Sequence, residues 1–166
     1  MNERSNLSTA ATIIDGPLTP FADRCRDVAG VDAIGVLLVT STTQLEVMAW
    51  SSDARPYLAA LELQTRQGPC LESYRTNQPV ATDDLAGTET SRRWPLFAPV
   101  AARAGLSGAG AVPMRLGHRV VGGMSLLRCH PVPIDAETLS AVQEMADRMM
   151  VDVLRPNRRR TTVLRR

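Results

Sequence analysis

The sequence predicts an α+β domain in which helices cover a mostly antiparallel sheet in two or three layers. Two observations support this prediction. Apolar, strand-like segments come in consecutive pairs, 31–40 with 45–50 and 108–116 with 119–128. Helical patterns stand before, between and after these pairs, and the 166 residues suffice for one domain with a single core.

The N-terminal part supplies the first helix and the first strand pair. Residues 1–15 are polar and aperiodic, which indicates a flexible arm. Apolar residues at helical spacing follow over 18–29, and Gly30 ends that helix. The run 31–40 is almost wholly apolar, as in a central strand covered on both faces. Because 45–50 alternates and follows a polar turn, the two segments are predicted to form an antiparallel hairpin.

A helical insertion separates the two strand pairs. Its first helix, 56–66, begins with a proline, which suits a first helical turn. Further on, we expect a short helix at 69–76, a short strand near 79–82 and a helix at 94–104.

The second strand pair and a long helix complete the predicted domain. Segment 108–116 alternates, a two-residue turn with a glycine follows, and 119–128 returns as its partner strand. The last helix spans about 135–154, where Asp135 can cap the N-terminus.

The stretch from Gln67 to Gly105 holds the candidate site. It lacks sustained apolar periodicity, yet it carries three of the six aromatic residues, Tyr74, Trp94 and Phe97. Aromatic side chains with a few polar groups are the usual lining of small-molecule sites, and Met114 on the following strand could join them. The alternative is a small core that pins the last helix of the insertion to the sheet. Both interpretations stay open.

The charged residues of this stretch give a weaker signal. Arg92 and Arg93 suit an anionic ligand because guanidinium groups match carboxylates and phosphates. The favoured alternative is a surface pair whose charge is balanced by Asp83, Asp84 or Glu89. Since the two aspartates are adjacent, they point to opposite sides of an extended segment. No carboxylate dyad and no catalytic residue is therefore predicted.

Cysteines and histidines form no metal, haem or disulfide pattern. His118 and His130 have no partner at ligand spacing, and the three cysteines are odd in number and widely spaced. Cys70 is the thiol of interest, whereas Cys25 and Cys129 lie on predicted helix and strand positions, where a buried apolar thiol is the default. The sequence predicts neither a signal peptide nor a membrane span. We therefore expect a cytoplasmic protein with reduced thiols.

Three segments resemble the GAF modules of actinobacterial regulators: QGPCLESYRTNQPVATDDL, RWPLFAPVAARAG and AVPMRLGHRVVGGMSLLR. The resemblance covers roughly 18–154 and is strongest over 67–128. It implies a GAF-like, PAS-related antiparallel sheet of about six strands with helices on both faces. It also implies small-molecule sensing and dimerisation through the terminal helices. In those regulators the module commonly precedes an RNA-binding ANTAR domain, for which twelve residues after the last helix leave no room.

The resemblance therefore implies a non-enzymatic sensory or regulatory protein, related to transcription regulators but without the ANTAR domain. We expect a flexible arm at 1–15, a GAF domain at 16–154 and a basic, disordered tail at 155–166. The predicted ligand-binding residues are Cys70, Tyr74, Arg93, Trp94, Phe97 and Met114. The sequence identifies neither the ligand nor a cofactor.

The motif GPC ending at Cys70 also resembles one active-site cysteine of the GAF-type free methionine sulfoxide reductases. That chemistry needs a second, resolving thiol nearby, which the family carries in the following loop. Residues 71–128 contain no cysteine. A reductase built on Cys70 is thus the least favoured function.

Charge and helix patterns indicate possible partners. Residues 1–154 hold 13 arginines against 17 acidic residues, a net charge of −4, while six arginines lie in the last twelve residues. Such a tail can dock an acidic partner or bind nucleic acid nonspecifically, or it can be a solvated terminus. The last helix has a wide apolar arc, because its methionines Met145, Met149 and Met150 extend beyond one narrow stripe. A helix that is apolar over so wide an arc is buried on two sides, which predicts a homodimer through this helix and the N-terminal one. A partner protein would supply the output domain, and no membrane partner is predicted.

Overall fold

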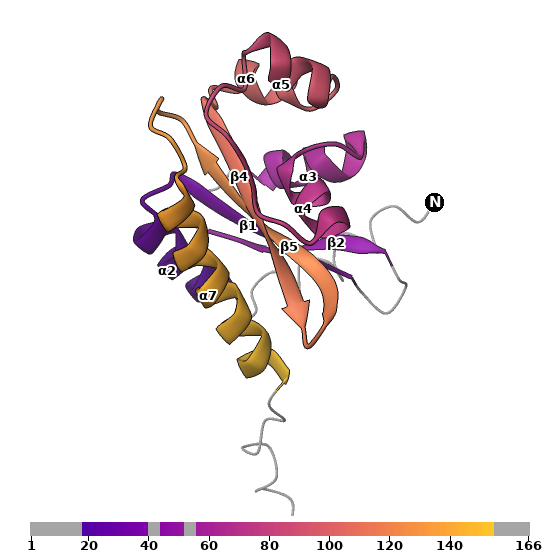
Figure 1. Ribbon diagram of the computed structural model, residues 1–166, viewed down its shortest axis with the longest axis vertical. Helices are drawn as coiled ribbons and strands as arrows, with labels where there is room; N and C mark the ends of the chain where they lie inside the picture. The colour runs from indigo at the N-terminus through magenta and orange to yellow at the C-terminus, as the bar shows by residue number, and fades with distance from the viewer. Residues whose placement is uncertain (1–17, 40–43, 52–55, 155–166) are drawn as a thin grey trace, which may run out of the picture.

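The computed structural model describes residues 18–39, 44–51 and 56–154, which form a sheet with helices on both faces (Figure 1). The strands are β1 (Ala33–Val39), β2 (Leu45–Trp50), β3 (Val80–Thr82), β4 (Gly108–Leu116) and β5 (Arg119–Arg128). The helices are α2 (Leu18–Ala29), α3 (Pro56–Thr65), α4 (Pro69–Thr76), α5 (Thr88–Arg93), α6 (Ala98–Arg103) and α7 (Ala136–Leu154). The predicted arm at 1–15 and the predicted tail at 155–166 lie outside the described residues.

The sheet has the strand order β2-β1-β5-β4-β3, and every neighbouring pair is antiparallel. Both predicted hairpins are present, β1 with β2 and β4 with β5, and β5 lies at the centre between β1 and β4. The α+β class and the antiparallel sheet with helices on both faces are confirmed. The described residues contribute five strands to this sheet, where about six were expected.

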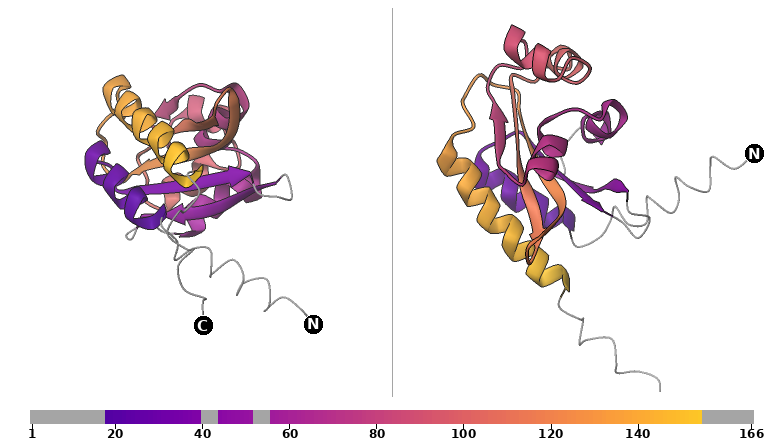
Figure 2. Two further views of the ribbon diagram at one scale, coloured as in Figure 1. Left: turned by 90° about the horizontal axis from the view of Figure 1, so that it is seen from below. Right: turned by 45° about the vertical axis from the view of Figure 1, so that its right-hand side comes forward.

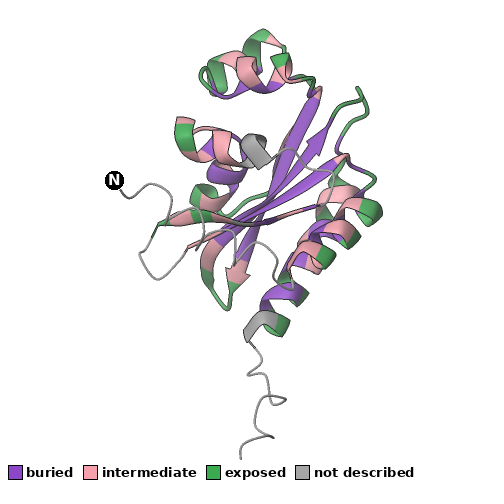
Figure 3. Ribbon diagram, turned by 180° about the vertical axis from the view of Figure 1, so that it is seen from behind, coloured by how far each residue is buried: buried purple, intermediate pink, exposed green. Residues whose placement is uncertain are grey.

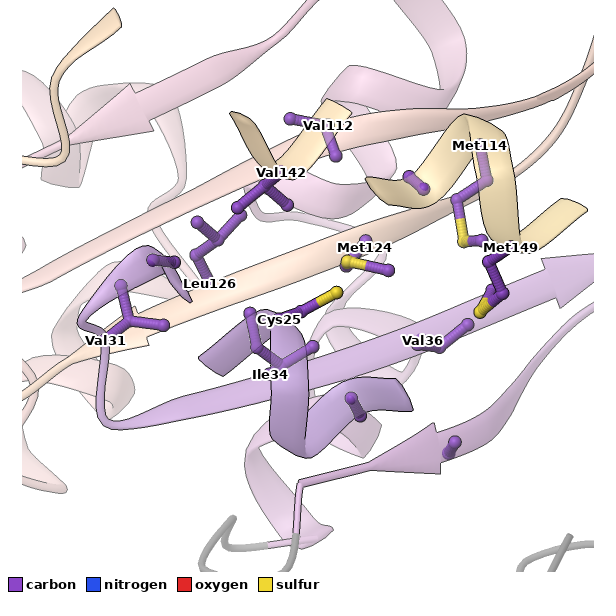
Figure 4. Packing of buried hydrophobic residues seen from close by; sticks show 14 of the residues in the cluster. Cys25, Val31, Ile34, Val36, Val112, Met114, Met124, Leu126, Val142 and Met149 are labelled. Atoms are coloured by element: carbon purple, nitrogen blue, oxygen red, sulfur yellow. The ribbon is translucent and has the colours of Figure 1, made fainter. Parts of the chain in front are cut away.

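One face of the sheet is covered by α2 and α7, which pack on each other and on the strands (Figures 1 and 2). The register pairs Val36 and Val112 with Met124 of β5, so the three side chains form one row on this face. Figure 4 shows this row meeting Cys25 of α2 and Met149 of α7. This cluster takes apolar side chains from α2, α7 and the strands, and the side-chain nitrogen of Gln143 on α7 donates to the carbonyl oxygen of Pro113 on β4.

The wide apolar arc of α7 is covered within a single chain. Met149 and Met150 are buried, and Met145 packs against the same cluster. The helix begins as predicted, because the Asp135 carboxylate accepts a hydrogen bond from the backbone N–H of Thr138 at 2.8 Å. The width of the arc therefore follows from packing against both α2 and the sheet.

Arg128, at the end of β5, joins the two terminal helices. Its buried guanidinium donates hydrogen bonds to the carbonyl oxygens of Ala29 and Gly30, where α2 ends. It also donates to the carbonyl oxygens of Val132 and Pro133, just before α7. One side chain thus satisfies carbonyl groups that the end of a helix leaves unpaired.

The opposite face of the sheet carries α3, α4, α5 and α6. Figure 3 shows that the central strands are buried while the outer sides of the helices are exposed. Ser125 of β5 pairs with Gly35 on one side and Ala111 on the other, so a row of small side chains points toward these helices. Small residues let α4 approach the sheet closely.

The helix predicted at 94–104 is only partly right, because α6 covers 98–103 while residues 94–97 form a turn that follows the separate helix α5. Trp94 ends α5 with φ −132° and ψ 69°, outside the helical region. The following residue is Pro95, which disfavours the helical conformation for the residue before it. Pro99 then stands in the first turn of α6, where a proline is tolerated.

Candidate functional site

A buried carboxyl from α3 caps the N-terminus of α4. Glu62 is 1% exposed, and its Oε2 accepts hydrogen bonds from the backbone N–H groups of Cys70 at 2.8 Å and Leu71 at 3.3 Å. Its Oε1 lies 3.2 Å from the hydroxyl oxygen of Ser125 on β5. The first turn of a helix leaves its N–H groups unpaired, so this carboxyl supplies the partners that the helix lacks.

Gly68 makes room for this carboxyl. It has φ 126°, in the region that favours glycine, and a Cβ there would lie 2.6 Å from Oε2 of Glu62. The Gly-Pro dipeptide at 68–69 therefore has two functions: the glycine admits the carboxyl, and Pro69 begins α4 without needing an N–H partner.

Burial dominates the electrostatics of Glu62. It raises the pKa of the carboxyl from 4.5 to about 8, although the hydrogen bonds from Leu71, Cys70 and Ser125 act in the opposite direction. A charged carboxylate without a neighbouring cation is costly in an apolar interior. The neutral acid is thus the form that burial favours.

The Cys70 thiol is packed against β5. It is 1% exposed, and a Cβ on Gly123 would lie 2.5 Å from its Sγ. Burial and then the charge of Glu62 raise its pKa well above the ordinary value, while a hydrogen bond with Ser125 lowers it. Because the thiolate is the reactive form, this thiol is poorly suited to act as a nucleophile.

The other cysteines differ from each other. Cys25 is buried as expected, and burial raises its pKa to about 12. The expectation that Cys129 is buried is wrong, because β5 ends at Arg128 and the next residue is exposed.

Glu72 of α4 joins α4 to the end of α5. Arg93 donates to its carboxylate through Nε, 2.9 Å from Oε2, and through Nη2 to Oε1. The indole N–H of Trp94 donates to the same Oε2 at 2.9 Å, and the guanidinium lies 4.8 Å from the Trp94 ring centroid. The hydrogen bond from Arg93 is the largest cause of a lowered pKa at Glu72.

The expected acidic partners of Arg93 are therefore only partly right. Asp83 and Asp84 are exposed and make no hydrogen bond with it, whereas Glu89 contributes a favourable charge. Glu72 is the main partner because the chain folds α5 back over α4 across 21 residues of sequence.

Trp94 and Phe97 pack edge to face. Their ring centroids lie 6.1 Å apart at an interplanar angle of 85°, and both side chains are buried. They belong to a cluster with Leu85, Ala101 and Leu127, which attaches α5 and α6 to the sheet. A further hydrogen bond joins the backbone N–H of Leu96 to the side-chain oxygen of Gln67 at 2.7 Å.

The predicted site residues divide between the two faces. Cys70 and the half-buried Tyr74 lie on α4, and Arg93, Trp94 and Phe97 lie together at α5 and α6. Met114 lies on the opposite face, in the cluster with α7 (Figure 4). The expectation that it joins the aromatic side chains fails because alternation along β4 places it beside Val112 instead.

Sequence reasoning missed Glu62, Ser125 and Glu72. One signal could have found Glu62: it stands between Leu61 and Leu63 in a helix whose leucines follow no single stripe. A glutamate between two leucines lies close to the apolar part of the helix, and in the structure Leu61 and Leu63 are half-buried while Glu62 is buried. Ser125 carried no comparable signal, since serine is common in strands and loops alike.

No group of three histidine, cysteine or acidic side chains that could hold a metal ion occurs within residues 18–39, 44–51 and 56–154. His118 and His130 are both exposed. Over the same residues, no helix combines the length and the apolar character that crossing a membrane requires.

The chain belongs to the GAF domain family, whose model, described as "GAF domain", matches residues 21–151. Domains of this family are sensory and bind ligands, and they are generally non-enzymatic. No curated protein sequence matches the chain.

Solved structures share this fold. The GAF domain of the cyanobacteriochrome TePixJ has 18% identity and a TM-score of 0.57, over 82% of this chain and 86% of that one. The second GAF domain of DevS from Mycobacterium smegmatis has 17% identity and a TM-score of 0.55, over 86% and 91%. NreA from Staphylococcus aureus, mutated in its nitrate binding site, has 15% identity and a TM-score of 0.55, over 71% and 87%. Identities this low establish a common fold and nothing more.

Proposed function

We propose that this GAF domain is a non-enzymatic sensor that binds a small molecule on the α3–α6 face of its sheet. The supporting observation is that elements of this face carry buried polar side chains: Glu62 and Ser125 contact each other, Ser73 bonds to Gln78, and Thr90 bonds to Thr82. A few fixed polar groups among apolar and aromatic side chains are what small-molecule sites use for orientation. Cys70, Tyr74, Arg93, Trp94 and Phe97 remain the proposed contact residues.

The signal is proposed to pass through the central strands to α2 and α7. Along β5, Ser125 faces Glu62 of α3, while its neighbour Met124 packs in the cluster with α2 and α7. A shift of β5 that follows ligand binding therefore acts on both faces, because successive side chains of a strand point to opposite sides.

A thermal-shift experiment tests this proposal. Ligands that bind the folded state must raise its melting temperature, so a metabolite library is tested on the full chain. For each hit, Trp94→Ala is expected to abolish the shift, and Met149→Ala, a truncation on the opposite face, is expected to keep it. The proposal is overturned if no compound stabilises the chain, or if Met149→Ala alone removes the shift.

The second candidate function is a ligand-free dimerisation and interaction module. Val28 on α2 and Val151 on α7 are 62% and 55% exposed, which leaves apolar side chains on both terminal helices for a second copy. Deleting 155–166 is then expected to abolish capture of an acidic partner while the fold persists. A monomer by size exclusion with light scattering at micromolar concentration would contradict the homodimer.

The proposed setting is that of a cytoplasmic transcription regulator of the actinobacterial type. The three GAF-like segments of the sequence support this setting. The Cys70-based reductase is the least supported function, because the thiol is buried and its pKa is raised.

A further inference from the structure

Glu62 is a carboxyl group enclosed by neutral partners. From α4 the backbone N–H groups of Cys70 and Leu71 donate to it, and from β5 the Ser125 hydroxyl lies 3.2 Å away. Strands β1 and β2 contribute apolar side chains that pack around Cys70 and do not titrate: Leu37, Leu45 and Val47. The influences that set the protonation of Glu62 are burial and three hydrogen bonds, and no arginine is among them.

The hydrogen bonds of the two carboxyl oxygens are unequal. Oε2 accepts both backbone N–H groups, at 2.8 and 3.3 Å, so it is occupied as an acceptor. Among the described residues, Oε1 has a hydrogen bond with the Ser125 hydroxyl alone, and a hydroxyl can accept a hydrogen bond as readily as it donates one. A proton on Oε1 can therefore be donated to Ser125 while the cap on α4 stays intact.

Small residues surround the Glu62 carboxyl and leave space for it and for its neighbours. Gly68 leaves space that any Cβ would take from the carboxyl, and Gly123 leaves space for Cys70 beside it. Ser125 has Gly35 and Ala111 as its cross-strand neighbours, so no large side chain competes for the space around its hydroxyl.

We propose that Glu62 is a proton switch: as the neutral acid it holds α3 to α4 and β5, and its ionisation loosens this junction. Losing the proton places a negative charge in a site to which the described residues bring no cation, so the junction opens toward water. The proposal concerns protons alone and stands whether or not the face binds a small molecule.

The direction of the pH dependence follows from the pKa of Glu62, which burial raises from 4.5 to about 8. The folded state binds the proton more tightly than the unfolded state. The contribution of Glu62 to stability is therefore fully present below 4.5 and is lost as the pH rises through about 8. Within this window one proton is released on unfolding.

The test compares the wild-type chain with Glu62→Gln, which keeps the neutral shape and cannot ionise. Urea unfolding is measured on the full chain from about pH 5 to about pH 9. The ratio of the wild-type folding constant to that of the variant is expected to fall up to about tenfold per pH unit inside the window. Parallel pH curves for the two proteins would overturn the proposal.

Glu72→Gln is the matched control, because Glu72 is a carboxyl of α4 whose pKa is lowered by Arg93. It is ionised in both folded and unfolded states over this range, so its variant should keep the wild-type slope. If Glu62→Gln fails to fold, carboxyl ¹³C shifts of the glutamate-labelled wild-type chain decide the question. One resonance titrating near pH 8 supports the switch, and titration of every glutamate below about pH 6 overturns it.

Discussion

On the α2–α7 side of the sheet, β5 presents Met124 and Leu126, whereas on the α3–α6 side the same strand presents Gly123 and Ser125. The first pair fills a continuous apolar cluster that both terminal helices share. The second pair leaves space, and buried polar groups such as Glu62 occupy it. Strand β5 thus contributes large apolar side chains to one face and small or polar residues to the other.

The difference shows where specificity can reside in this domain. An apolar cluster is stabilised by the area that it buries and tolerates changes of shape among apolar side chains. A junction made of a carboxyl, a thiol and a hydroxyl depends on direction and on protonation, so it responds to solution conditions. We therefore expect variants of the two faces to differ in kind as well as in size.

The largest effect is expected for Phe97→Ala, which removes a buried ring that packs edge to face on Trp94. Such truncations lower the free energy of unfolding by about 3–5 kcal/mol. Met124→Ala on the other face should cost about 2–5 kcal/mol. Urea unfolding measures both losses.

Hydrogen exchange distinguishes these two variants. Phe97→Ala should speed exchange in α5 and α6, whose attachment to the sheet depends on that cluster, and Met124→Ala should do so in α2 and α7. Faster hydrogen exchange at the same amides in both variants would contradict this difference between the two faces.

A smaller effect is expected for Gly123→Ala, because the new Cβ would lie 2.5 Å from the Sγ of Cys70. Overpacking of this kind costs about 1–3 kcal/mol. Cys70→Ala in the same chain should recover part of the loss, and a double-mutant cycle measures the coupling. Gly122→Ala is the matched control, since its Cβ would meet the backbone oxygen of Leu37, which Cys70→Ala cannot relieve.

Most of the fold could be predicted because hydrophobic periodicity and turn residues are properties of short segments of the sequence. The ranges 108–116 and 119–128, predicted from alternation and a glycine turn, match β4 and β5, and the predicted helix 69–76 matches α4. The helix predicted at 94–104 begins four residues too early, because Trp94 precedes Pro95 and lies outside the helical region, so that only 98–103 form α6.

The candidate site was predicted less well, because its contacts join residues far apart in the chain. Trp94 and Phe97 were found from composition alone, yet the partners of this region are Glu72 and Gln67. Glu62 meets Ser125 across 63 residues of sequence, and no local pattern encodes that meeting. Met114 was misplaced because one alternating strand serves both faces, and the sequence does not say which residues face which helices.

The smallest effect is expected at the ion pair of Glu72 and Arg93. Both side chains are partly exposed, so solvent screens the pair and Glu72→Gln should cost about 0.5–1 kcal/mol near neutral pH. Glutamine keeps an acceptor for the Trp94 indole, so the variant removes charge and little else. The pH dependence of this pair follows from the pKa of Glu72, which Arg93 lowers in the folded state. The contribution of Glu72 to stability is therefore present above 4.5 and is lost as the pH falls through the pKa of the folded state. The variant and the wild type should therefore converge in acid, and added salt should also reduce their difference. Glu62 is expected to behave in the opposite way, losing its contribution on the alkaline side. Urea unfolding over the full pH range measures both carboxyls, and equal pH dependence for the two variants would show that burial does not separate them.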